Sequence, residues 1–156
     1  MSEITNTQKY ENYRSQMGRL NRAIKEHFLL EAMFIEAAII EDRCESLLKH
    51  SNAFNPAKHT SMDRILARLK EMARNKSGLL QKYITVELLD EIYAWKKERN
   101  RLTHALMKQQ LTGEEMMGIV EQGQAIIKTL CSKTTSYNRA LQRQAAKEQQ
   151  DSTSQA

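Results

Sequence analysis

Three side chains that suit phosphate chemistry, Arg99, Asn100 and His104, lie close together in the segment KKERNRLTHALM, residues 96–107. Histidine titrates near neutral pH, so it can accept or deliver a proton during a reaction. Arginine stays charged, and its planar fork can bind the non-bridging oxygens of a phosphate as charge builds on them. Asparagine can orient the histidine or hydrogen-bond the substrate. These types suit cleavage of RNA by attack of the ribose 2′-hydroxyl on the adjacent phosphate, which requires no metal ion.

Helical geometry decides how these three side chains can meet. On a helix Asn100 and His104 are four positions apart and share one face, whereas Arg99 and His104 differ by about 140° around the axis. A long arginine can wrap toward the histidine, or a second copy of the helix can supply the missing half across a two-fold axis. The spacing therefore makes a homodimer part of the catalytic hypothesis. The alternative interpretation is the charged, solvated face of an ordinary helix.

The elements that position this segment are predicted to be helices. The chain has one proline and five glycines in 156 residues, and apolar residues recur at helical spacing along nearly all of it. This pattern predicts an all-α fold, an antiparallel bundle of four to five helices with a long C-terminal helix. We expect a single domain over residues 1–147 and a polar, disordered tail over 148–156. The predicted helices cover about Lys9–Leu20, which can also run on into the next, Ala23–His50, Met62–Lys76, a segment from Thr85 through the motif, and Thr112–Ala146.

Polar residues mark several of the predicted helix ends. Thr60 or Ser61 can cap the third helix and Thr85 the fourth, while Thr112 and Glu115 form a capping-box pattern before the last. His27, His50 and His59 fall near predicted helix ends or in the loop, which indicates surface or capping roles.

The central helix is predicted to be buried on more than one side. Its inward residues are expected to be Ile24, Phe28, Ile35, Ile39, Cys44, Leu47 and Leu48. Glu36 lies within the apolar run MFIEAAII, where an unpaired carboxylate is costly to bury. We therefore consider Glu36 a supporting residue that pairs with and positions Arg99. The alternatives are an exposed seam or an ion pair with Arg43.

Positive charge is concentrated in two regions of this chain of net charge +5. One is the segment 58–82, and the other surrounds the motif. Such charge attracts polyanions, and we expect it to contact the RNA backbone. The candidate RNA-binding residues are Arg64, Arg68, Arg74, Lys96, Lys97 and Arg101. Solvated helix faces are the alternative interpretation of the same charges.

The segment LLDEIYAWKKERNRLTHAL, residues 88–106, resembles the signature region of the HEPN superfamily. These are small helical-bundle proteins whose arginine-polar-x-x-x-histidine motif often marks an RNase. Arg99, Asn100 and His104 match the motif, and Leu89, Ile92 and Trp95 match the apolar residues before it. The resemblance implies a dimer with facing motifs, and often a toxin-antitoxin or phage-defence role with an antitoxin protein as partner. Leu106 stands where members inactivated by tyrosine modification carry the tyrosine, so that inactivation is not expected here.

Other residue classes narrow the expected function. Cys44 and Cys131 lack metal or redox spacing, no carboxylate or histidine cluster has metal spacing, and we expect no metal and no cofactor. The apolar run FLLEAMFIEAAII is too short to span a bilayer, and we expect a cytoplasmic protein without membrane contact. Trp95 is expected to be a core anchor. The rival to an endoribonuclease is a non-catalytic helical module that binds RNA or a protein with the same surface, and a structural or regulatory dimer is a third hypothesis.

Overall fold

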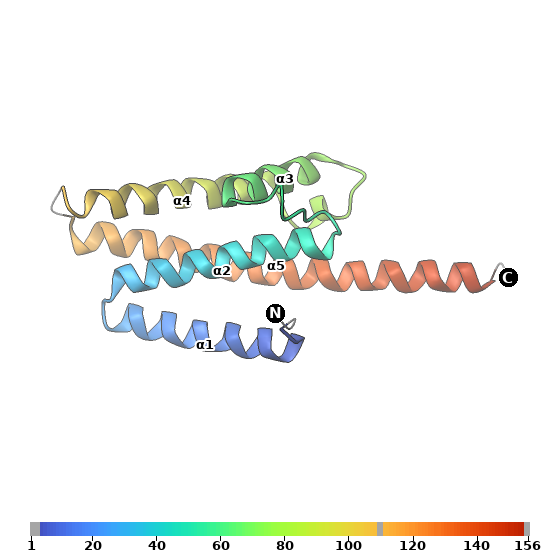
Figure 1. Cartoon of the computed structure of the whole chain (residues 1–156), viewed down its shortest axis with the longest axis horizontal. Helices are drawn as coiled ribbons and strands as arrows, with labels where there is room; N and C mark the ends of the chain where they lie inside the picture. The colour runs from blue at the N-terminus through green and yellow to red at the C-terminus, as the bar shows by residue number, and fades with distance from the viewer. Residues whose placement is uncertain (1–3, 109–110, 155–156) are drawn as a thin grey trace. The chain divides into compact units, whose positions relative to one another are not determined.

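The computed structural model describes residues 4–108 and 111–154, and this part of the chain is helical without a strand (Figure 1). The predicted all-α class is therefore confirmed. The helices are α1 (Asn6–Lys25), α2 (Leu29–His50), α3 (Met62–Arg74), the short 3-10 helix η1 (Leu80–Lys82), α4 (Val86–Ala105) and α5 (Gly113–Ser154).

The chain forms two compact units. Helices α2, α4 and α5 contribute to both, whereas α1 lies in unit 1 and α3 in unit 2. Unit 1 consists of residues 1–42 and 94–127, and unit 2 of residues 43–93 and 128–156. The segment with Arg99, Asn100 and His104 lies in unit 1. The prediction of a single domain over residues 1–147 stays a prediction.

Unit 1 contains α1 and parts of α2, α4 and α5. In Figure 1 α1 runs antiparallel to α2, and the guanidinium of Arg19 is 3.1 Å from the carboxylate of Glu31 across this pair. The indole Nε1 of Trp95 donates a 2.9 Å hydrogen bond to the carbonyl of Ile119, which joins α4 to α5. Apolar side chains from all four helices are buried, including Leu20, Met33, Ile40, Leu102, Val120 and Ile127.

Unit 2 is built around α3, η1 and the remaining parts of α2, α4 and α5. The hydroxyls of Ser51 and Tyr137 lie 2.7 Å apart, and the rings of Tyr83 and Tyr137 pack at 6.0 Å. An ion pair between Lys70 and Asp90 joins α3 to α4. Its core includes Leu47, Leu48, Ile65, Leu66, Leu69, Ile84, Leu89 and Ile92.

The predicted caps are present at three helix ends. Ser61 caps α3 by accepting a hydrogen bond from the amide of Arg64, and Thr85 accepts one from Leu88 before α4. At the start of α5 the hydroxyl of Thr112 accepts from the amide of Glu115, whose carboxylate accepts from the amide of Thr112. This reciprocal pair is the predicted capping box.

The predicted start of the central helix is wrong. Ala23 belongs to α1, which ends at Lys25, and α2 starts only at Leu29. His27 between them has φ 58°, and the amide of Phe28 donates back to the carbonyl of Ala23. This is a Schellman turn, in which a left-handed residue closes the helix and redirects the chain. Of the residues predicted to point inward, Ile35, Ile39, Cys44, Leu47 and Leu48 are buried, Ile24 is half-buried, and Phe28 is 55% exposed because the turn carries it outward.

The last helix, α5, is longer than predicted. It continues past Ala146 to Ser154, through most of the segment 148–156 for which a disordered tail is predicted. Residues 155–156 of that tail lie outside the described residues. The side chains of Ser152, Thr153 and Ser154 bond the carbonyls four residues earlier, and the preceding residues are mostly good helix formers. From residue 142 onward every described side chain of α5 is exposed.

We predict that His27→Gly stabilises the fold by about 1 kcal/mol, because a side chain with a Cβ atom is strained at φ 58° and glycine is not. Urea unfolding followed by circular dichroism measures the change. The matched control is Lys25→Gly, an exposed helical position two residues earlier, where glycine should destabilise by about 1 kcal/mol. Equal destabilisation by both changes would contradict the assignment of the turn.

Candidate functional site on helix α4

Arg99 and Asn100 form a hydrogen-bonded pair on α4. Both residues are half-buried. The side-chain oxygen of Asn100 accepts hydrogen bonds from Nε and Nη2 of Arg99, at 3.2 and 2.6 Å. Because a guanidinium has only donors, the amide oxygen must be the atom that faces it. Asn100 therefore holds Arg99, and the expected orientation of His104 by Asn100 is not formed.

Trp95 lies beneath the arginine, one helical turn earlier. The guanidinium carbon of Arg99 is 5.8 Å from the centre of the indole ring, within the range of a cation-π contact. Trp95 is 2% exposed, which confirms its predicted place in the core. Its contact with Arg99 was not predicted, although a spacing of four residues on a helix permits it.

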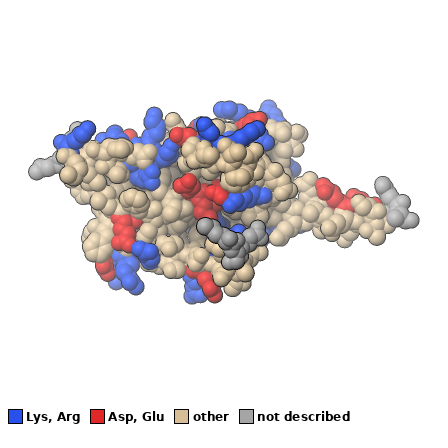
Figure 2. Space-filling model, viewed as in Figure 1, with Lys and Arg blue, Asp and Glu red and all other residues tan. Residues whose placement is uncertain are grey.

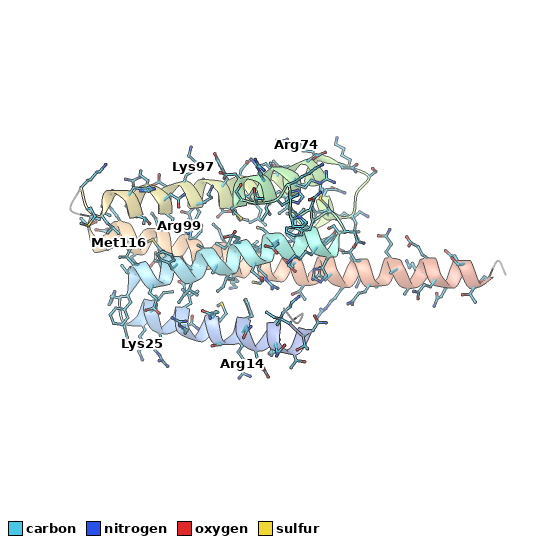
Figure 3. All side chains as sticks on the ribbon, in the orientation of Figure 1. Arg14, Lys25, Arg74, Lys97, Arg99 and Met116 are labelled. Carbon is cyan, nitrogen blue, oxygen red and sulfur yellow. The ribbon has the colours of Figure 1, made fainter. Side chains whose placement is uncertain are left out.

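His104 lies in the last turn of α4 and is exposed. Its imidazole makes no hydrogen bond to any residue that the structure describes. The buried residues of α4 at Trp95 and Leu102 place Arg99 on the core-facing side, whereas His104 is about 140° away around the axis from Arg99. Figure 3 shows Lys97 and Arg99 on opposite edges of α4. One copy thus bonds Arg99 to Asn100, while His104, on the same face as Asn100, is hydrogen-bonded to neither.

Glu36 is fully buried in α2, and its surroundings differ from those expected. Neither carboxylate oxygen has a hydrogen-bond partner among the described residues. The expected pairing with Arg99 is therefore wrong, as are the alternative pairing with Arg43 and the exposed seam. The carboxyl group lies instead against Gly123 of α5, where an added Cβ atom would be 2.6 Å from its Cδ. Gly123 is needed here because any larger residue would collide with the carboxyl group.

Burial raises the pKa of Glu36 from its ordinary value of 4.5 to about 8. The cause is desolvation, which disfavours the charged form of a carboxyl group in an apolar interior. At neutral pH the side chain is therefore mainly protonated. A neutral acid explains how the helix tolerates this residue without a cationic partner.

The basic residues around the motif have different surroundings. Arg101 is paired with Glu98 at 3.0 Å, and this hydrogen bond and the opposite charge raise the pKa of the Arg101 guanidinium. Lys97 is exposed and Lys96 half-buried. The positive charge of Arg101 is thus partly compensated within the helix, while Lys97 projects from it (Figure 3).

The candidate RNA-binding residues of α3 belong to unit 2. Arg68 forms an ion pair with Glu71 at 2.9 Å, and Arg64 donates hydrogen bonds to the loop before its helix. Arg74 lies in the last turn and is exposed. Figure 2 shows lysine and arginine side chains interspersed with acidic ones on the visible face of the molecule. A mixed surface of this kind has a weaker field than the sum of its positive charges suggests.

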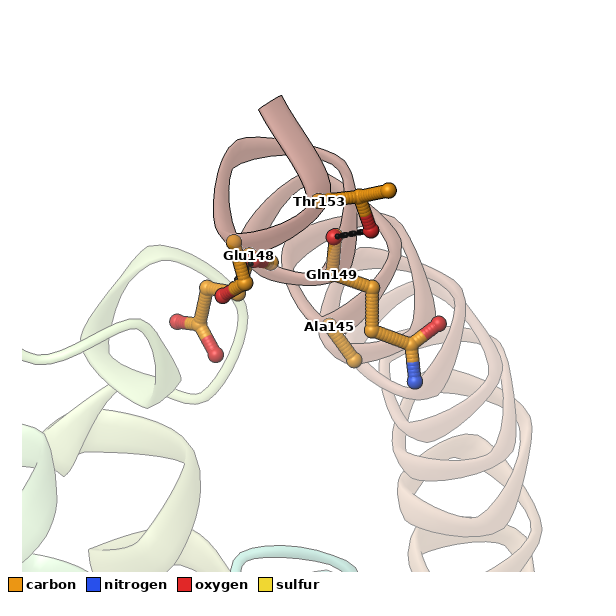
Figure 4. Close-up of a pocket in the computed structure, with 5 residues that line it drawn as sticks. Ala145, Glu148, Gln149 and Thr153 are labelled. Atoms are coloured by element: carbon orange, nitrogen blue, oxygen red, sulfur yellow. Dashed lines mark hydrogen bonds between the residues drawn. The ribbon is translucent and has the colours of Figure 1, made fainter. Parts of the chain in front are cut away.

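Sites for other ligands are sparse in the described part of the chain. Residues 4–108 and 111–154 contain no group of three or more histidine, cysteine or acidic side chains that can hold a metal ion. In this same part, none of the helices combines the length and apolar character needed to cross a membrane. A surface hollow beside α5 is lined by Ala145, Glu148, Gln149, Ser152 and Thr153 (Figure 4). All five lie on one exposed helix, which cannot enclose a ligand.

Comparison of the chain with protein-family models, with curated proteins and with solved structures found no match.

We predict that the stability of the protein falls as pH rises from about 4.5 to about 8. In this range the folded protein keeps the proton of Glu36 while the unfolded chain releases it. The slope should be about 1.4 kcal/mol per pH unit near the middle of the range. Glu36→Gln cannot ionise, so its stability should lose this slope and exceed that of the parent at pH 8. Urea unfolding at pH 5, 6.5 and 8 measures both.

The matched control is Glu41→Gln, an exposed position on the same helix. It should keep the pH slope of the parent. An identical slope in the parent and in Glu36→Gln would show that Glu36 is not the group whose proton is linked to folding.

Proposed function

We propose that this chain is a metal-independent endoribonuclease of the HEPN type that acts as a homodimer, the toxin of a toxin-antitoxin or phage-defence system. The observation that carries the proposal is the arrangement on α4, where Arg99, bonded to Asn100, lies five positions before an exposed His104. In the reaction His104 moves the proton of the 2′-hydroxyl or of the leaving oxygen. Arg99 stabilises the charge that builds on the phosphate.

The homodimer follows from the divergence of the two catalytic side chains. In one copy Arg99 is hydrogen-bonded to Asn100, and the exposed side chain of His104 is bonded to neither residue. Two copies of α4 related by a two-fold axis can place the arginine of one against the histidine of the other. Lys96, Lys97 and Arg101 then border the RNA path, and the basic face of α3 contributes further backbone contacts.

Glu36 enters the proposal in a changed role. It supports the site by filling the interior of unit 1 beside Gly123, and it makes no charge contact with Arg99. Because α2 and α5 approach closely there, α5 can in turn hold Trp95 through the carbonyl of Ile119.

A second function, RNA or protein binding without cleavage, is favoured by the same divergence. A held arginine with flanking lysines can bind a phosphate backbone even where no histidine reaches the reacting atoms. Affinity that depends on salt without any product would indicate this function.

The first prediction from this proposal concerns catalysis. Arg99→Ala and His104→Ala should each lower RNA cleavage by about 100-fold or more, since each removes a group that acts in the transition state. Gel assays with and without EDTA measure the rate, which EDTA should not change. Circular dichroism and size-exclusion chromatography should show fold and dimer intact, and His104→Ala should relieve any toxicity on expression.

Mixing the two inactive variants tests the composite site. A mixed dimer carries one site with both residues intact, so a random mixture should regain about a quarter of the parent activity. A site contained within one copy predicts no recovery. A parent protein that binds RNA but never cleaves it would contradict the enzymatic proposal and favour the binding module.

The second prediction concerns α3. Changing Arg64, Arg68 and Arg74 together to glutamate should weaken RNA binding and lower the salt slope of the binding constant by about 2, since each lost phosphate contact removes about 0.7 for a single strand. Filter binding at several salt concentrations measures this. The control variant changes three exposed residues of α5 to glutamate: Arg139, Arg143 and Lys147. Equal losses in both variants would attribute binding to net charge rather than to α3.

A further inference from the structure

The guanidinium of Arg99 is occupied on one edge only. Its side edge, formed by Nε and Nη2, donates both hydrogen bonds to the Asn100 oxygen. Nη1 makes no hydrogen bond within residues 4–108 and 111–154. A guanidinium carries five N–H donors in a rigid plane, and its end edge, formed by Nη1 and Nη2, can bind two oxygens of one phosphate. Asn100 thus leaves open the edge that is suited to bidentate phosphate binding.

The guanidinium of Arg99 also lies over a buried aromatic ring. Trp95 lies 5.8 Å from the guanidinium, and the indole is itself immobile because it is buried and bonded through Nε1 to the backbone of α5. A cation over an aromatic face loses little of its charge to the contact and keeps its N–H donors available at the edges. The ring therefore restrains Arg99 without competing for the atoms that an anion would bind.

We propose that Asn100 and Trp95 are positioning residues, Asn100 through the side edge of the Arg99 guanidinium and Trp95 through its cation-π contact, so that the end edge is presented to a phosphate of RNA. We call the restraint of Arg99 by Asn100 and Trp95 the arginine clamp. The assignment of RNA as its ligand rests on the proposed function, whereas the clamp itself does not. A preorganised arginine binds with less loss of side-chain freedom than a mobile one. Asn100 accordingly acts through Arg99 and has no direct contact with the reacting atoms.

The clamp is tested first without RNA, by hydrogen exchange and NMR of the Arg99 Nε–H. In the parent this hydrogen should exchange at least about 10-fold more slowly than in Asn100→Leu, which removes the acceptor. Asn100→Asp keeps an acceptor oxygen and should keep the protection. Thr103→Ala, which removes only a hydrogen bond to the backbone carbonyl of Arg99, should have no effect on the Nε–H. Equal exchange in the parent and in Asn100→Leu would overturn the proposal.

Inorganic phosphate then tests which edge is open. If phosphate binds at the end edge, the chemical shift of the Arg99 Nε–H should stay unchanged, because its bond to Asn100 is kept, while the Nη signals shift. A displaced Nε–H signal would show that phosphate competes with Asn100, which overturns the assigned edge. Trp95→Phe keeps an aromatic face and should retain the protected Nε–H, whereas Trp95→Leu should lose part of it. If Trp95→Leu does not fold, the Asn100 variants still decide the outcome.

Cleavage kinetics separate this inference from the proposed function. If the chain cleaves RNA, Asn100→Leu should lower kcat about 10-fold or more with KM changed by no more than about twofold, and Asn100→Asp should restore it. A protected Nε–H in a parent that never cleaves RNA would refute the proposed function and leave the clamp standing. Full activity in Asn100→Leu together with an unprotected Nε–H in the parent would refute the clamp and leave the function standing.

Discussion

The contact between the carboxyl group of Glu36 and Gly123 is the constraint on which the packing of unit 1 depends. A polar group enters the interior without a hydrogen-bond partner, which costs on the order of 1–3 kcal/mol, and it enters where the opposite helix has no side chain. The cost is limited because the group is neutral at ordinary pH. The apolar residues around it, such as Met33 and Ile40, supply the burial that offsets the rest.

Trp95 connects the packed interior of unit 1 to Arg99. The indole is hydrogen-bonded to the backbone of α5, and the guanidinium of Arg99 lies over its ring. A core residue therefore restrains the half-buried Arg99. This explains why Arg99 occupies a position on the core side of α4, where an arginine would otherwise be expensive to bury. Asn100 satisfies two donors of the half-buried guanidinium.

Helical periodicity and cap chemistry were sufficient to predict the class of fold, most helix positions and the caps at Ser61, Thr85 and Thr112, since all of these depend on neighbours in sequence. The turn at His27 was missed because glycine usually marks a left-handed helix end, and histidine rarely does. The burial of Glu36 could be predicted from its apolar flanks, but its contact with Gly123 depends on a helix 87 positions away. The motif could be placed on one helix, yet the partner of Asn100 is a rotamer choice that spacing does not determine.

The position of Arg99 limits which mechanisms this chain can support. The contacts with Asn100 and Trp95 restrain the guanidinium of Arg99, and no side-chain hydrogen bond joins it to His104 of the same copy. The proposed acid-base mechanism accordingly takes its histidine from a second copy of the chain. The surrounding charge is a weak guide to that contact, because Arg101 and Arg68 are each paired within their own helix. In the proposed site, recognition of a phosphate would then depend on the geometry of one preorganised arginine more than on the net charge of the surface.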